Sequence, residues 1–151
     1  MVELPASPLG AEPVARQTGG CLCGKLRFET GGTSRHTMYC HCFFCRRQTG
    51  APVAAFAEFD ITDGFGWSKG RPATYRSSPQ VRRKFCRTCG TPLTFEADHY
   101  PGRIYVALGA FDDPNRFPPA AHDHVDHRIA WFDTTDRLPR HDGSSLDRVD
   151  R

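Results

Sequence analysis

Seven cysteines in three short clusters constrain the fold of this chain more than any other feature. The clusters read Cys21-Leu22-Cys23-Gly24, Cys40-His41-Cys42-Phe43-Phe44-Cys45 and Cys86-Arg87-Thr88-Cys89-Gly90. Two cysteines separated by one or two residues supply half of a tetrahedral zinc site, and a second pair from elsewhere completes it. A glycine after such a pair is typical of a metal-binding turn, because the backbone there often needs a positive φ. The first and third clusters therefore predict one closed zinc site formed by Cys21, Cys23, Cys86 and Cys89.

The three remaining cysteines, Cys40, Cys42 and Cys45, have no fourth cysteine to close a site. Three protein ligands are typical of a catalytic zinc, which keeps one position open for water or substrate. The alternative is a set of redox-active or simply buried thiols that hold a metal weakly or not at all. His41 lies between two ligands, so we assign it a position beside the metal or facing the substrate rather than a ligand role. We call these three cysteines the triplet, and we predict that they bind a second, labile and catalytic zinc.

Disulfide bonds are the alternative interpretation of all these cysteines. The sequence has no run of about 18 apolar residues that would span a membrane. Residues 1–16 also lack the basic segment and apolar stretch of a signal peptide. We therefore expect a cytoplasmic protein, in which thiols stay reduced and clustered cysteines bind metal. The close spacing within each cluster and the odd total also argue against disulfide pairing.

The formal net charge of +3 is too small to indicate a nucleic-acid partner by itself. The positions of the cations are more informative, since Arg46 and Arg47 directly follow Cys45. Further cations surround Cys86, namely Arg82, Arg83, Lys84 and Arg87. Zinc with four thiolates carries a charge of about −2, which nearby cations stabilise. Two interpretations stay open here: charge compensation on a solvated face, and a binding site for an anionic substrate.

Short strand-like segments separated by glycine and proline run through the chain and predict a mainly β protein. The expected strands are residues 25–29, 37–39, 53–59, 73–76, 81–85 and 103–108, with a further alternation around Leu93 and Phe95. No segment offers about twelve residues of helical apolar spacing. Asp112-Asp113-Pro114 predicts a single helical turn. The fold class we expect is a single compact domain of short antiparallel sheets with few short helical turns.

The length of 151 residues suits one domain with its own core. We expect a flexible N-terminal segment over 1–16, the zinc domain over 17–140 and a flexible polar tail over 141–151.

Three histidines near the end of the expected domain, His122, His124 and His127, alternate with Asp123 and Asp126. No helix is predicted there to bring the imidazoles onto one face. We therefore interpret this stretch as a surface loop rather than a third metal site.

The clusters belong to a longer ordered pattern. It comprises Gly19-Gly20-Cys21-Leu22-Cys23-Gly24, Tyr39-Cys40-His41-Cys42, Cys45-Arg46, Gln48-Thr49-Gly50-Ala51, Arg83-Lys84-Phe85-Cys86-Arg87-Thr88-Cys89-Gly90-Thr91, Asp112-Asp113-Pro114, His122, Trp131 and Leu138-Pro139. In this combination the chain resembles the family of glutathione-dependent formaldehyde-activating enzymes, which includes centromere protein V. The resemblance covers about residue 17 to residue 140.

The resemblance implies a compact, β-tent-like zinc fold in which sheets flank the structural metal. It assigns the structural zinc to the four-cysteine set and the catalytic zinc to the triplet. In the founding enzyme, formaldehyde and glutathione join to give S-hydroxymethylglutathione, formally a carbon–sulfur lyase reaction run in reverse. Family members often carry apolar or aromatic residues after the histidine that matches His122. This chain instead has Asp123-His124-Val125-Asp126-His127.

We therefore expect a zinc-dependent enzyme, similar to a carbon–sulfur lyase, that joins or cleaves the adduct of a small aldehyde and a glutathione-like thiol. Three thiolates around zinc leave a charge of about −1, which favours activation of the thiol over polarisation of the aldehyde. The expected site residues are Cys40, Cys42 and Cys45, with His41 as a proton carrier and Arg46 or Arg47 holding a substrate carboxylate. The alternative is a non-enzymatic zinc scaffold that binds a protein or nucleic acid through its basic surface. The intact triplet favours the enzyme, because a scaffold has no need of a second, open zinc.

Overall fold

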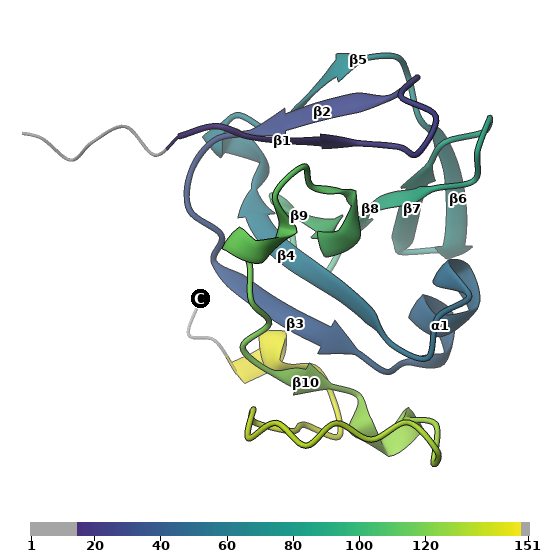
Figure 1. The fold of residues 1–151 in the computed structure, drawn as a ribbon, viewed down its shortest axis with the longest axis vertical. Coiled ribbons are helices and arrows are strands. Elements are labelled where there is room, and N and C mark those ends of the chain that lie inside the picture. Colours follow the sequence, from purple (N-terminus) through teal and green to yellow (C-terminus); the bar gives the residue numbers. More distant parts are fainter. Residues whose placement is uncertain (1–14, 149–151) are drawn as a thin grey trace, which may run out of the picture.

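The computed structural model describes residues 15–148, and two β-sheets carry the fold of this part of the chain (Figure 1). The smaller sheet has the order β1-β2-β5 and contains β1 (Gln17–Gly20), β2 (Arg27–Thr30) and β5 (Gly66–Lys69). The larger sheet has the order β10-β3-β4-β9-β8-β7-β6 and contains β3 (His36–Cys40), β4 (Ala54–Asp60), β6 (Ala73–Ser78), β7 (Val81–Phe85), β8 (Pro92–Ala97), β9 (Arg103–Ala107) and β10 (His122–Asp123). Neighbouring strands are antiparallel, except that β10 runs parallel to β3. The predicted mainly β fold is confirmed.

Helical structure in the described residues is short. The α-helix α1 (Phe43–Thr49) begins after Cys42 and ends at Gly50, whose φ of 70° is left-handed. The sequence analysis missed it because seven residues are too few to show helical periodicity. The 3-10 turns are η1 (Ile61–Asp63), η2 (Leu108–Ala110), η3 (Pro114–Arg116), η4 (Val125–His127) and η5 (Ser145–Arg148), and η3 confirms the helical turn predicted from its proline. No helix within residues 15–148 has the length and apolar character needed to cross a membrane.

Strand β1 was not predicted, because it ends in two glycines, which are poor strand formers. Gly19 has a packing reason to be there. A Cβ atom at this position would lie 2.3 Å from the backbone oxygen of Ala110 and 2.9 Å from Cα of Phe111. The missing side chain therefore lets β1 approach the η2 turn of the other sheet closely.

Two apolar cores lie on opposite faces of the larger sheet. Side chains alternate along β9, so that Ile104 and Val106 join the first core while Tyr105 joins the second. The first core lies against the smaller sheet and contains Phe28, buried among the rings of Phe65, Trp67 and Phe111. The second core contains Met38, Cys40, Cys45, Ala54, Phe56, Ala97, Tyr100, Tyr105 and Leu146. The first core also holds Cys21 and Cys86, so each cysteine group is anchored in a different core.

The segment after residue 140 packs against the domain, although the sequence analysis expects a flexible tail over 141–151. The backbone of His141 bonds with His122, and the His124 amide donates to the Gly143 carbonyl at 2.9 Å. Leu146 is buried in the second core. This one apolar side chain anchors an otherwise polar segment beside β10, as Figure 1 shows. Residues 149–151, and residues 1–14 of the expected N-terminal segment, lie outside the described part.

Candidate metal centres and the active-site cavity

The four-cysteine set joins the two sheets. Cys21 and Cys23 lie on the turn between β1 and β2, whereas Cys86 and Cys89 lie on the turn between β7 and β8. All four sulfurs are within 4.8 Å of one another, and Cys23 Sγ is 3.5 Å from Cys21 Sγ and 3.8 Å from Cys86 Sγ. Sulfurs about 2.3 Å from a tetrahedral zinc lie about 3.8 Å apart. The four free thiols therefore have the spacing of a closed zinc site.

The two turns have the expected local structure. Gly24 and Gly90 both adopt positive φ angles, 73° and 78°, which confirms the role predicted for them. The Leu26 amide donates to Cys21 Sγ at 3.2 Å. Hydrogen bonding to Thr91 lowers the pKa of Cys89 to about 5, so this thiol is ionised at neutral pH and ready to bind a metal.

The triplet forms where strand β3 passes into helix α1. Cys40 ends β3, Cys42 caps α1, and Cys45 lies in the first turn of the helix. Because only His41 separates the strand from the cap, the three sulfurs converge within 4.8 Å of one another. Cys40 and Cys45 are buried, whereas Cys42 is half-buried.

Hydrogen bonds within the triplet distribute its protons unequally. The Cys40 and Cys45 thiols lower the pKa of Cys42 to about 2, and the Cys45 amide also donates to Cys42 Sγ at 3.3 Å. The hydrogen bonds to Cys42 and Cys45 raise the pKa of Cys40. Cys42 therefore has the lowest pKa of the three thiols. Three converging sulfurs form a donor set that fits zinc.

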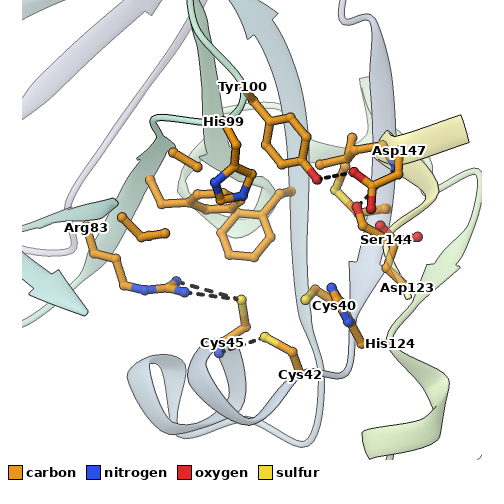
Figure 2. A pocket seen from close by; sticks show the side chains of 16 residues that line it. Cys40, Cys42, Cys45, Arg83, His99, Tyr100, Asp123, His124, Ser144 and Asp147 are labelled. Carbon is orange, nitrogen blue, oxygen red and sulfur yellow. Dashed lines mark hydrogen bonds between the residues drawn. The ribbon is translucent and has the colours of Figure 1, made fainter. Parts of the chain in front are cut away.

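All three triplet cysteines line a cavity of about 360 Å³ (Figure 2). The apolar wall consists of Met38, Phe56, Val81, Phe95, Ala97 and Leu146. The polar lining consists of Arg83, His99, Tyr100, Asp123, His124, Ser144 and Asp147. The triplet thus has the accessible space that an open metal site requires.

Among the described side chains, Arg83 is the only lysine or arginine that lines this cavity. Its Nη1 and Nη2 atoms lie 3.7 and 3.8 Å from Cys45 Sγ, and its Nε donates to Ser77 Oγ at 2.9 Å. In the sequence, Arg83 belongs to the group of cations around Cys86. Side chains alternate along β7, so Arg83 faces the cavity, whereas Arg82 faces the opposite side of the sheet and pairs with Asp98.

Arg46 and Arg47, predicted to bind substrate, do not line the cavity. Arg46 Nε donates to the His41 carbonyl at 3.1 Å, and the Arg47 guanidinium lies 4.7 Å from the centre of the Phe43 ring. Both side chains border a different hollow beside Trp131. The cation next to the triplet is therefore Arg83.

His41 is buried behind the triplet and does not line the cavity. Its Nε2 lies 2.8 Å from His122 Nδ1, and His122 Nε2 lies 3.1 Å from the carboxylate of Asp136. His41, His122 and Asp136 therefore form one hydrogen-bonded chain behind the triplet. Burial, together with His122, lowers the pKa of His41 and keeps it neutral.

The prediction of a surface loop from His122 to His127 was wrong for His122. This residue pairs with Tyr39 in the sheet, and its imidazole is fully buried against the Tyr39 ring. His124 lines the cavity, whereas His127 is exposed. A parallel pair as short as β10 with β3 leaves no periodic signal in the sequence.

These features define a β domain with one closed four-cysteine group and one open three-cysteine group in a cavity. The chain belongs to the family described as glutathione-dependent formaldehyde-activating enzyme, whose sequence profile matches residues 16–127. The chain is also similar to a protein from Rhodobacter sphaeroides of known crystal structure. The similarity has a TM-score of 0.54 and 25% identity, and covers 66% of this chain and 93% of that one. The segment that carries Ser144, Leu146 and Asp147 lies beyond the profile match.

Arg83→Gln is expected to raise the pH at which the triplet releases zinc by about one unit. Hydrogen bonding to Cys40 lowers the pKa of Cys45, but hydrogen bonding to Cys42 and burial raise it to about 11, and Arg83 opposes that rise. Without the cation the thiol pKa rises further, so protons displace the metal at a higher pH. Zinc released during an acid titration measures the midpoint. Arg82→Gln on the same strand is the control, and an equal shift there would contradict a local effect of Arg83.

Proposed function

We propose that the protein is a zinc-dependent enzyme, of the carbon–sulfur lyase type, that forms or cleaves the adduct of a small aldehyde and a thiol. The observation that carries this proposal is the convergence of three cysteine sulfurs on the wall of a cavity beside a buried arginine. A purely structural site is closed by four protein ligands, as the other cysteine group is. Family membership supports formaldehyde and glutathione as reference substrates.

The reaction makes one carbon–sulfur bond. The thiol sulfur bonds to the carbonyl carbon, the C=O π bond breaks, and the carbonyl oxygen gains the proton that the thiol loses. Cleavage of the adduct reverses each of these changes. Zinc bound by Cys40, Cys42 and Cys45 supplies the chemistry of lowering a thiol pKa, so that thiolate is available at neutral pH.

The surrounding residues prepare the cavity for this reaction. Arg83 offsets the negative charge of the clustered thiolates through its contact with Cys45. Arg83 and Cys45 are both buried, and burial strengthens that electrostatic contact. His41 acts as a positioning residue, because its hydrogen bond to His122 fixes the residue that separates Cys40 from Cys42 in the chain. Arg46 supports the same loop through the His41 carbonyl.

Exchange NMR with ¹³C-formaldehyde and glutathione tests the proposal. The zinc-loaded protein is expected to accelerate interconversion of free aldehyde and adduct at least tenfold over the spontaneous reaction. The acceleration should saturate with substrate, because the adduct occupies a defined cavity. Free zinc at the same concentration is one control, and the surface variant Arg47→Gln is another. If the rate matches the spontaneous reaction for every aldehyde and thiol tried, the scaffold alternative replaces the enzyme.

A further inference from the structure

We infer that the cavity binds an ammonium group through Asp123 and Asp147, so that the preferred thiol, or its aldehyde adduct, carries an amino group. The assignment of the ligand's sulfur as the reacting atom rests on the proposed function. The ammonium site itself rests on the charges and burial of the cavity, and it can be tested without any reaction.

Asp123 is a buried carboxylate that lines the cavity and lacks a partner. Its exposed fraction is 2%, and its Oδ1 atom has no hydrogen-bond partner in the structure. No ion pair within residues 15–148 neutralises it. An unpaired buried carboxylate is costly, and a bound cation with N–H donors removes that cost.

The backbone holds Asp123 firmly in this position. Asp123 pairs with Cys40 across the parallel strands, and its backbone carbonyl accepts a hydrogen bond from the His41 amide at 3.0 Å. The next residue, His124, has a φ of 56° and is the only non-glycine residue with positive φ among the described residues. Strained backbone of this kind persists where the surrounding structure imposes it, often at ligand sites. The carboxylate is therefore held at the cavity wall by the same sheet that holds the triplet.

Asp147 adds a second carboxylate on the same side of the cavity. Figure 2 shows Asp123, Ser144 and Asp147 on one side, and Arg83 with Cys45 on the other. Asp147 Oδ1 accepts from the Tyr100 hydroxyl at 2.7 Å, which orients the carboxylate without neutralising its charge. Arg83 and the two carboxylates thus lie on opposite sides of the cavity, and the triplet lies between them, with Cys40 on the side of Asp123 (Figure 2).

This charge layout selects one class of ligand. A short molecule that has its sulfur at the triplet and its ammonium beside Asp123 and Asp147, with an apolar part against Met38 and Phe56, matches this arrangement (Figure 2). A thiol with two carboxylates needs cations at the acidic end. Arg83 cannot supply them, because it lies across the cavity and bonds with Cys45 and Ser77. Besides Arg83, the basic side chains among the described residues of the lining are the imidazoles of His99 and His124.

Three thioethers of similar size test the inference on the full-length, zinc-loaded protein: 2-(methylthio)ethylamine, 2-(methylthio)ethanol and 3-(methylthio)propionate. They differ in terminal charge, and none has a thiol proton, so binding is independent of catalysis. Isothermal titration calorimetry is expected to give the lowest Kd for the amine, at least tenfold below that of the alcohol, and the highest for the carboxylate. Asp123→Asn should abolish this order. It should also raise the Tm of the ligand-free protein, because it removes a buried unpaired charge.

The matched control is Asp126→Asn, an exposed aspartate three residues away that does not line the cavity, and it should keep the wild-type order. Equal binding of the three probes, or tightest binding of the carboxylate, overturns the inference. A lower Tm in Asp123→Asn with an unchanged order shows a structural role and also overturns it. If Asp123→Asn does not fold, Asp147→Asn carries the same test, since an amide oxygen still accepts from Tyr100.

The binding experiment and the NMR assay fail independently. If the amine probe binds most tightly but adduct exchange is not accelerated, the ammonium site stands and the proposed function is rejected. If adduct exchange is accelerated but the three probes bind equally, the proposed function stands and the ammonium site is rejected.

Discussion

Cys86→Ser is expected to abolish the fold. Cys86 directly follows β7, has an exposed fraction of 2%, and belongs to the same core as Cys21. A serine hydroxyl does not replace a thiolate on zinc, so the link between the two sheets is lost. A structural zinc contributes about 10–16 kcal/mol of apparent binding free energy. That is comparable to the whole stability of a typical domain, about 5–15 kcal/mol.

Circular dichroism and the soluble yield measure this outcome. The variant should be recovered insoluble or without the β-sheet signal of the wild type. Cys42→Ser is the matched control, because it makes the same chemical change in the triplet. A Cys86→Ser protein that remains folded with wild-type Tm would contradict the structural role of the four-cysteine set.

Cys42→Ser is expected to leave the fold intact and to remove one zinc per chain together with the activity. The three triplet sulfurs lie on one short stretch of β3 and α1, so the metal there links no distant parts of the chain. Their site also opens to the cavity, which lets a chelator reach it. A mild chelator should therefore have the same effect as the substitution. Loss of the metal should return the exchange rate to that of the spontaneous reaction, a fall of about tenfold or more.

Native mass spectrometry gives the zinc content, circular dichroism the fold, and exchange NMR the activity. The expected result is a change from about two zinc ions per chain to about one, with an unchanged spectrum. Re-addition of zinc should restore the chelated wild type but not the variant. If adduct exchange proceeds at the wild-type rate after the triplet has lost its metal, the proposed catalytic role of that site is wrong.

Local patterns in the sequence were sufficient to predict the cysteine groups and most of the strands. The spacing within Cys21–Cys23 and Cys86–Cys89 predicted two paired turns, and both contain the expected left-handed glycine. Alternation predicted 103–108 as a strand, and β9 spans Arg103–Ala107. These features depend on residues within a few positions of one another, so the sequence alone carries them. Zinc itself stays a prediction at both sites.

The residues around the triplet were decided by the tertiary structure. Arg83 is 38 residues from Cys45 in the chain and reaches it only because β7 and α1 pack together. His122 is likewise 81 residues from His41. The sequence analysis placed substrate binding on Arg46 and Arg47 because they follow Cys45 directly, but a helix turns adjacent side chains to different faces. Asp123 reaches the cavity through a parallel pairing of β10 with β3 that has no local signature. The sequence thus determined which sulfurs can hold metal, whereas long-range strand pairing decided which side chains surround them.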